Sequence, residues 1–308
     1  MGQLKDMSDP CDIVFIGNYT KDTIVTSSEV KTVDGGAFRY GAYVAAAMGL
    51  KTAAVTHLAE EDFHVVEMLR ELGIEVRVFK TPSSTSLRLE YPGDDVDNRI
   101  IRVISDAGAF SSEEVRDISA KAAVFGASFR GEIGLPVIEL FTRKGARTAV
   151  DLQGFLRVVR NGKLIFEEWP EEEEILSVVD VVKADAVEAS FLTGIEATPW
   201  GMKEAARIIA EKGKNRDEPS EVLITHKDGM IVYCRGCYYE EKFYPKQLSG
   251  RSGRGDTCIA AYMSARLNSP PQEAVVWAAA VTTLKMENSS PFSRGIEEVN
   301  RLIKEKYS

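Results

Sequence analysis

The chain has 308 residues, a length that fits one large α/β domain or two smaller ones. Its 38 Lys and Arg residues against 47 Asp and Glu residues give a net charge of −9, which argues against a nucleic-acid partner. No apolar run approaches the ~18 residues of a membrane span, and residues 1–10 lack the apolar segment of a signal peptide. These features predict a cytoplasmic protein that binds neither nucleic acid nor membrane.

The first part of the chain predicts helices and strands in an irregular order. We expect helices at 37–48 and 60–72 and strands at 11–16, 22–27, 52–56 and 74–79. The helix at 37–48 ends at Gly49, a residue typical of helix C-termini. Two further segments, 20–34 and 85–105, have the pattern of hairpins. We expect them to form a small β flap, or lid, over one edge of the core.

From residue 120 onward, short apolar runs alternate with helical segments. The predicted strands are 122–125, 148–151, 178–182 and 222–225, and the predicted helices are 135–144, 171–176, 186–192, 202–212, 255–267, 272–286 and 295–305. Short, wholly apolar strands are typical of a parallel sheet that is buried on both faces. The alternation therefore predicts a doubly wound, mostly parallel sheet flanked by helices. We interpret residues 1–308 as a single domain that carries the lid.

The four cysteines do not indicate a disulfide-stabilised scaffold. Cys234-Arg-Gly-Cys237 is a single C-x-x-C, and a zinc site usually needs a second pair. The flanking strand-like runs favour a β-hairpin with its turn at Arg235-Gly236. A redox or metal role, or a disulfide in a thermophilic source, remains an alternative.

The segment Leu248–Cys258 has the strongest chemical signal. Gly250, Gly253 and Gly255 come directly before a predicted helix, where free backbone N–H groups can approach an anion closely. Asp256 follows in the first helical turn, where a carboxylate can take a proton from an attacking hydroxyl. Arg254 between the glycines can hold a phosphoryl group with two hydrogen bonds. Taken by itself, the loop would favour Asp256 acting only as a helix cap, and it is not a Walker P-loop because no Gly-Lys-Ser/Thr follows.

Several segments in order resemble the ribokinase-like (PfkB) carbohydrate kinase family. Gly253-Arg-Gly-Asp256 resembles the C-terminal signature of the family, and Gly17–Asp22 resembles its first strand and turn. Further resemblances are Gly35-Gly36 with the following helix, Asp185-Ala-Val-Glu188 with Leu192-Thr-Gly194, and Val222–Thr225 with Gly229. Together they extend from about residue 11 to residue 290.

This resemblance implies a ribokinase-like fold and an ATP-dependent transfer of phosphate to a hydroxyl group. Asp256 would be the general base, and Gly253, Gly255 and Arg254 would stabilise the transferring phosphoryl group. The resemblance places ATP near the following residues: Asp185, Thr225, Gly229, Gly253, Gly255 and Asn288. It places Mg²⁺ near Glu188, held mostly through water.

The acceptor would be a small polyol or sugar. Candidate residues for binding it are Asp22, Gly35, Gly36, Arg39, Gln153 and Arg157. The glycine loop and Asp151–Arg157 resemble most the branch of the family that includes archaeal myo-inositol kinases, so myo-inositol is the expected acceptor. Another sugar, a sugar acid, a sugar phosphate or a nucleoside remains an alternative.

The chain also departs from the family pattern. Gly250 and Arg251 stand where the family has Asp and Thr, Tyr40 replaces an Asn, and Asp185 replaces another Asn. The missing Asp argues against a monovalent-cation site that uses it. These departures also motivate a rival interpretation, a catalytically silent sugar sensor. The lid strands further suggest a homodimer through the lid, since exposed strand edges invite pairing.

Overall fold

The computed structural model describes residues 10–91, 99–213, 220–250 and 252–307. Arg251 and most of the N-terminal segment discussed above lie outside these residues.

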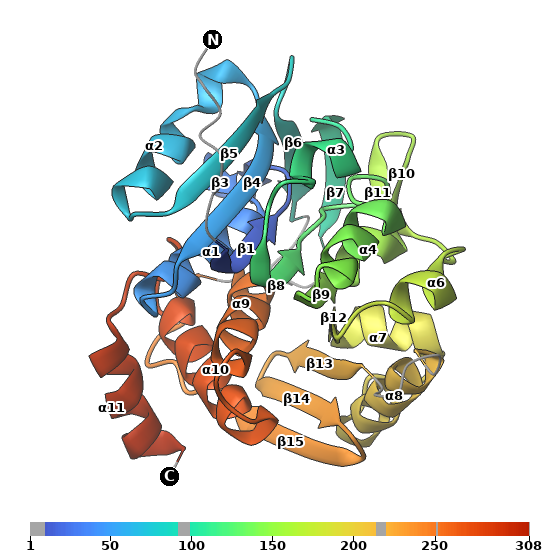
Figure 1. Cartoon of the computed structure of the whole chain (residues 1–308), viewed down its shortest axis with the longest axis vertical. Coiled ribbons are helices and arrows are strands. Elements are labelled where there is room, and N and C mark those ends of the chain that lie inside the picture. The colour runs from blue at the N-terminus through green and yellow to red at the C-terminus, as the bar shows by residue number, and fades with distance from the viewer. Residues whose placement is uncertain (1–9, 92–98, 214–219, 251, 308) are drawn as a thin grey trace.

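A mixed sheet forms the centre of the molecule (Figure 1). In the described residues its strand order is β15-β14-β13-β12-β9-β8-β1-β4-β5, and neighbouring strands are parallel from β13 to β5. The strands are β1 (Cys11–Ile16), β4 (Thr52–Leu58), β5 (Glu75–Lys80), β8 (Ala120–Phe125), β9 (Arg147–Asp151), β12 (Val181–Asp185), β13 (Glu221–His226), β14 (Gly229–Cys234) and β15 (Cys237–Lys242). The predicted doubly wound, mostly parallel sheet is confirmed.

Helices cover both faces of this sheet because its strands are apolar on both sides. In β1, Ile13 and Phe15 belong to one buried cluster, whereas Val14 and Ile16 belong to another. The first cluster includes residues of α1 (Ala37–Ala47), α2 (His64–Glu71), α9 (Arg254–Arg266), α10 (Pro271–Met286) and α11 (Ile296–Lys306). The second includes residues of α3 (Ser112–Val115), α4 (Leu135–Arg143), α6 (Glu172–Leu176), α7 (Ala186–Thr193) and α8 (Pro199–Lys212).

A second sheet forms the lid. Its order in the described residues is β10-β11-β7-β6-β2-β3, and it combines both segments that the sequence predicts for the lid. Its strands are β2 (Thr20–Val25), β3 (Val30–Gly35), β6 (Thr85–Glu90), β7 (Ile100–Ser105), β10 (Arg157–Arg160) and β11 (Lys163–Phe166). The β10–β11 hairpin is not predicted by the sequence analysis. Its turn, Asn161-Gly162, has φ of 49° and 73°, the left-handed conformation that these residues favour.

Several element boundaries differ from the predictions. β12 begins at Val181 and not at residue 178, and β2 begins at Thr20 and not at residue 22. α8 begins at Pro199, because the Thr198 hydroxyl accepts a hydrogen bond from Gly201 N at 3.0 Å and caps the helix. The predicted Cys234–Cys237 hairpin is confirmed by the β14–β15 pairing, and both cysteines are free thiols.

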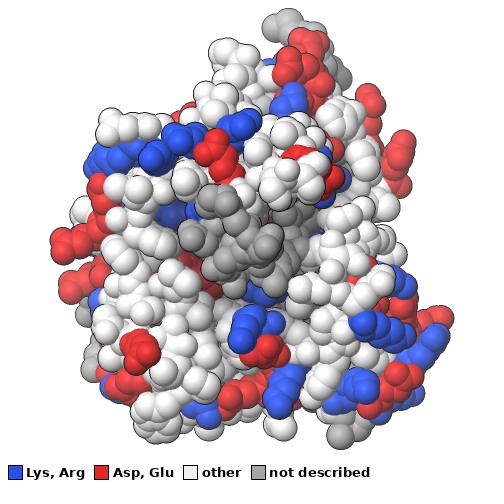
Figure 2. All heavy atoms as spheres, turned by 180° about the vertical axis from the view of Figure 1, so that it is seen from behind, with Lys and Arg blue, Asp and Glu red and all other residues white. Residues whose placement is uncertain are grey.

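The surface carries charges of both signs. On the face shown in Figure 2, Lys and Arg side chains form a row near the upper left edge, and elsewhere they lie among Asp and Glu side chains. No helix in the described ranges is long and apolar enough to cross a membrane.

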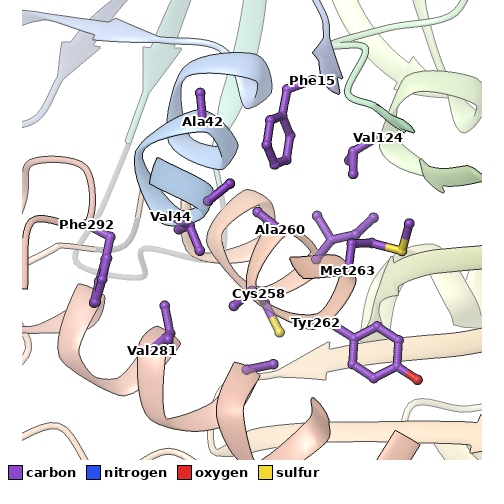
Figure 3. Close-up of a cluster of buried hydrophobic side chains, with 14 of the residues drawn as sticks. Phe15, Ala42, Val44, Val124, Cys258, Ala260, Tyr262, Met263, Val281 and Phe292 are labelled. Carbon is purple, nitrogen blue, oxygen red and sulfur yellow. The ribbon is translucent and has the colours of Figure 1, made fainter. Parts of the chain in front are cut away.

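Helix α9 lies deep in the core, which fixes the position of its N-terminus. Its residues from Thr257 to Ser264 are all buried, because α1, α10 and the sheet surround it (Figure 3). Phe15 and Val124 contribute from the sheet, and Val281 contributes from α10. A helix that is apolar all round is typical of a central core position. Its half-buried first turn is therefore continuous with a segment that lies wholly in the core.

Candidate active site

A cavity of about 1670 Å³ lies between the lid and the carboxyl ends of the parallel strands. Its walls include Asp151, Asp185 and Thr225 at strand ends, residues 31–34 of the lid, and Gly253–Asp256 at the start of α9. In doubly wound folds, ligands bind at this edge of the sheet. The cavity is therefore the candidate active site.

The glycine loop brings backbone N–H groups to the cavity. Gly253 precedes α9 with φ of 72° and ψ of 9°, a left-handed conformation. A Cβ atom at Gly253 would also overlap the ring of Tyr40. Glycine is thus required here both for the turn and for the close contact. The turn leaves the first N–H groups of α9 without partners in the helix, which makes this end of α9 suited to an anion.

Asp256 lines the cavity from the first turn of this helix. No described residue forms a hydrogen bond or ion pair with its carboxylate. Burial raises the pKa of Asp256, the charges of Lys183 and Arg157 oppose this rise, and the nearby carboxylate of Asp22 adds to it. A carboxylate with raised proton affinity and no protein partner is suited to accept a proton from a bound hydroxyl.

Behind Asp256 lies a network of buried charges. Lys183 Nζ is 2.9 Å from Asp151 Oδ2 and 3.9 Å from Glu188 Oε2. Arg157 donates from Nη2 to Glu188 Oε1 at 2.9 Å. A Cβ atom on Gly255 would lie 2.8 Å from Lys183 Nζ, so the ammonium group packs directly against the first turn of α9.

Lys183 adds a permanent positive charge to the cavity wall. Burial alone would lower the pKa of Lys183, but the carboxylates of Asp151 and Glu188 raise it above its usual value. The side chain therefore stays protonated at neutral pH. Lys183 is not among the residues predicted from the sequence. The available signal was a lysine within the apolar run Val181–Ala184, where a charged residue is rare unless it has a partner.

The hydrogen bonds of Glu188 leave neither of its carboxylate oxygens free for the metal that the sequence places near it. Glu188 Oε1 accepts from Arg157, and Oε2 accepts from Asp185 N at 2.8 Å as part of a capping box at the start of α7. Both oxygens are thus engaged. The described residues contain no group of three or more His, Cys, Asp and Glu that could hold a metal. Mg²⁺ commonly needs one or two carboxylates together with water and substrate phosphates, and the Asp185 and Asp256 carboxylates on the cavity wall fit that need.

The structure brings together the predicted acceptor residues Asp22 and Gly35. A Cβ atom on Gly35 would lie 2.8 Å from Asp22 Oδ2. Asp22 Oδ1 is buried and has no hydrogen-bond partner among the described residues. Burial raises the pKa of Asp22 to about 6, although a hydrogen bond from Thr20 and the charge of Arg99 oppose the rise. Buried carboxylate oxygens usually have a hydrogen-bond partner, so we predict that a ligand hydroxyl supplies one here, although Asp22 does not itself line the cavity in this structure.

The other predicted acceptor residues lie around the same space. Arg39 donates from Nη1 to Asp34 O at 3.0 Å, while its buried Nε has no partner among the described residues. Gln153 donates to Ala127 O at 3.3 Å, and both it and Arg157 line the cavity. Gly36, with φ of 100°, comes directly before α1, the helix that carries Arg39. Gly36, Asp22 and Gly35 do not line the cavity.

The predicted nucleotide residues are placed less uniformly. Thr225 lines the cavity, with Arg254 and the segments 226–228 and 289–291. Gly229 and Asn288 lie behind this wall, where Gly229 packs against the backbone of Glu241. The two residues thus support the wall and do not form it.

Comparison with known proteins assigns the chain. The profile of the pfkB family carbohydrate kinases matches residues 8–293. The chain belongs to this family. It is a kinase of the ribokinase fold that acts on a sugar or polyol. A search of curated proteins found no match.

Solved structures agree in fold. A pyrophosphate-dependent kinase of the ribokinase family, in complex with a pyrophosphate analog and myo-inositol, is 32% identical, with a TM-score of 0.83 over 94% of this chain and 99% of that one. The sulfate complex of a pyrophosphate-dependent kinase of the ribokinase family is 34% identical, with a TM-score of 0.84 over 94% and 99%. Arabidopsis thaliana ribokinase with ribose and ATP is 19% identical, with a TM-score of 0.73 over 96% and 99%, and shows the shared fold.

Proposed function

We propose that this kinase phosphorylates one hydroxyl of myo-inositol and that inorganic pyrophosphate is its donor. The observation that carries the proposal is the half-buried Asp256 carboxylate, which has no partner among the described residues and lines the cavity from the N-terminal turn of α9. The acceptor and donor are inferred from similarity to pyrophosphate-dependent kinases, one of them in complex with myo-inositol. The ATP that the sequence analysis expected becomes the second candidate donor.

In the proposed reaction, Asp256 takes the proton of the attacking hydroxyl. The hydroxyl oxygen forms a bond to the terminal phosphorus of the donor, while the bond from that phosphorus to its bridging oxygen breaks. The remaining phosphate leaves with the electron pair of that bond. Because Asp256 has a raised pKa, it is a stronger base than an exposed aspartate.

The positive groups around Asp256 offset the charge of the transferring phosphoryl group. The amides of the Gly253–Gly255 turn point to the anion site, and Arg254 and Lys183 lie beside them. In phosphoryl transfer most of the catalysis comes from such positioning and charge stabilisation. Mg²⁺, when bound with the donor, would neutralise phosphate charge near Asp185. On the acceptor side, Asp22 can accept from a polyol hydroxyl through its unpartnered Oδ1.

A specific observation keeps ATP as a candidate. Beyond Asp185, the cavity has an apolar wall built from Ala186, Val187, Ala197, Pro199 and Met202. Pyrophosphate has no apolar part to cover this wall, whereas the base of a nucleotide does. The cavity volume of about 1670 Å³ also exceeds the space that pyrophosphate and a polyol need.

The test is product formation followed by ³¹P NMR. The purified protein with Mg²⁺ is given pyrophosphate or ATP, each with myo-inositol, ribose, fructose, fructose 6-phosphate or adenosine. A new phosphate monoester that needs both pyrophosphate and myo-inositol supports the proposal. If the same product forms with ATP and not with pyrophosphate, ATP is the donor. If the product forms from another acceptor and not from myo-inositol, that compound is the acceptor. If no mixture gives a product but myo-inositol raises the melting temperature, the protein is the sensor of the rival interpretation.

A further inference from the structure

Lys285 is a buried lysine that the proposed reaction does not use. It lies near the C-terminal end of α10, is 1% exposed, and does not line the cavity. Its Nζ donates to Asn288 O at 3.0 Å and lies 5.7 Å from the centre of the Tyr40 ring. An ammonium group has three N–H donors. Within the described residues, no other hydrogen-bond acceptor and no carboxylate ion-pair partner reaches it.

The ammonium group lies where two cavity walls join. The first wall is the segment 289–291, which follows Asn288, and the second begins at Ser249 and Gly250. The N–H groups of Ser249 and Gly250 donate to Met286 O at 3.0 and 3.1 Å. A Cβ atom at Gly250 would overlap Asn288 O, the same carbonyl that accepts from Lys285. Lys285 thus holds the turn after α10 in the place where the glycine loop packs on it.

The same ammonium group also lies behind the anion site. The Tyr40 ring beneath which it packs is the ring that contacts Gly253. The ionisable groups that face it are the Asp256 carboxylate from α9 and the Tyr40 phenol from α1, and burial keeps that phenol neutral by raising its pKa to about 12. Burial lowers the pKa of Lys285 to about 8, and the charge of Asp256 opposes this.

Such a group is costly to the fold. A charge buried without an ion pair lowers stability, and replacing it by an apolar group of similar size is often neutral or stabilising. Residues kept at a cost in stability are typical of functional sites. A purely structural role would be served better by methionine or leucine at this position.

We propose that Lys285 is a positioning residue for phosphoryl transfer, whose buried ammonium group holds the glycine loop against the turn after α10 and, while protonated, adds a positive charge behind the anion site. It acts through Asn288, Tyr40 and the loop and does not touch the substrate. The inference rests on the proposed function only in that the transferred group is a phosphoryl group. Either donor would bring its negative charge to the same N-terminal turn of α9.

The test is Lys285→Met, which keeps the length of the side chain and removes the charge. We expect turnover to fall 10-fold to 100-fold, on the order of what a misplaced catalytic loop costs. The KM of the donor should rise, while the KM of the acceptor stays the same. The melting temperature at pH 7 should be unchanged or higher. Lys306→Met, at an exposed lysine of α11, is the matched control and should leave all four quantities unchanged.

The pH dependence gives a readout that a structural role would not change. As the pH rises through about 8, the wild-type ammonium group loses its proton, so kcat/KM for the donor should fall over that range. Lys285→Met should lack this fall. A lower melting temperature with normal turnover per folded molecule would overturn the inference, and so would an unchanged donor KM.

The inference can fail separately from the proposed function. If the wild-type protein transfers no phosphate, calorimetry with pyrophosphate still measures binding at the anion site. We then expect Lys285→Met to weaken pyrophosphate binding about tenfold, matching the loss expected in turnover. Equal binding by the wild type and by the variant would overturn the role of Lys285 whatever the reaction is.

Discussion

The two ends of helix α9 each carry a cluster of buried charges, and the clusters differ. At the C-terminal end, Glu221 accepts from Tyr262 at 2.5 Å and from Arg266 at 2.7 and 3.1 Å, and its Oε1 lies 2.7 Å from Arg147 Nη2. Burial alone would raise the pKa of Glu221, but Arg266, Arg147 and Tyr262 lower it to about 2. At the N-terminal end, the pKa of Asp256 is raised and its carboxylate has no partner among the described residues.

This contrast separates a structural cluster from a reactive one. A carboxylate whose oxygens are all engaged contributes to folding and has nothing left to offer a ligand. A buried carboxylate without partners lowers stability, and its free oxygens and raised proton affinity are available to a substrate. The same helix thus anchors the core with one end and presents a base with the other. Stability and turnover should therefore respond oppositely to changes at the two ends.

The largest effect on turnover is expected from Asp256→Asn. Without the base, turnover should fall about 10²-fold to 10⁴-fold. The pKa of Asp256 is raised in the folded state, so its ionised form opposes folding once the pH rises above the pKa that Asp256 has in the unfolded chain. At pH 7 the amide removes that penalty, and the melting temperature should be equal or higher. Initial rates and thermal unfolding measure the two effects.

A control for Asp256→Asn exists at the opposite edge of the sheet. Asp12 pairs with Lys121 at 2.7 Å, outside the cavity, so Asp12→Asn should leave turnover unchanged. If Asp256→Asn kept near-normal turnover, Asp256 would not be the base, and the contrast between the ends of α9 would lose its functional meaning.

The largest effect on stability is expected from Glu221→Gln. Removing one partner from a buried ion cluster leaves Arg147 and Arg266 uncompensated, which costs about 3 kcal/mol. The pKa of Glu221 is lowered in the folded state. Its contribution to the free energy of unfolding is therefore fully present above the pKa of Glu221 in the unfolded chain and is lost as the pH falls toward about 2. Urea unfolding at pH 7 and pH 3 should show a gap between wild type and variant that narrows at pH 3. An equal gap at both pH values would contradict this assignment.

The sequence predicted the main sheet well because its strands are apolar on both faces, a pattern that is local. It placed β12 three residues too early, because Val178 and Val179 extend the apolar run while the strand itself ends in Lys183 and Asp185. It missed the β10–β11 hairpin despite the Asn161-Gly162 signal, because two strands of only four residues each are too short to show a clear periodicity.

The candidate site was predictable where a motif is contiguous. The loop Gly253–Asp256 is one such segment, and its glycines are explained by the turn that they form. Lys183 and Lys285 were not predicted, because burial of a lysine depends on partners that only the tertiary structure brings together. Lys183 lies within a short apolar run, which is a local signal of burial, whereas a lone lysine such as Lys285 is more often exposed.

Asp22→Asn should weaken acceptor binding and leave the donor KM unchanged. Loss of a hydrogen bond to a charged group costs about 10-fold to 100-fold in affinity. Since the pKa of Asp22 is raised to about 6, the wild-type KM for the acceptor should rise as the pH falls below 6, whereas the KM of the variant should not depend on pH there. Glu90→Gln is the control, because both oxygens of this lid carboxylate already accept hydrogen bonds, from Arg88 and Arg102, whereas Asp22 Oδ1 has no partner among the described residues. A pH-independent wild-type KM would refute a role for the ionised carboxylate.

The smallest effect concerns the turn that begins α9, and Gly49 provides a matched control for it. Gly253 and Gly49 have φ of 72° and 74°, so an alanine at either position bears the same left-handed strain, roughly 1–2 kcal/mol. A Cβ atom at Gly49 meets no atom within 4 Å, whereas at Gly253 it overlaps the Tyr40 ring. Gly49→Ala should therefore lower stability alone, while Gly253→Ala should lower stability further and also reduce turnover. The difference between the two variants isolates the contact that aims the first turn of α9 at the cavity, and equal losses in both would show that the ring moves aside without cost.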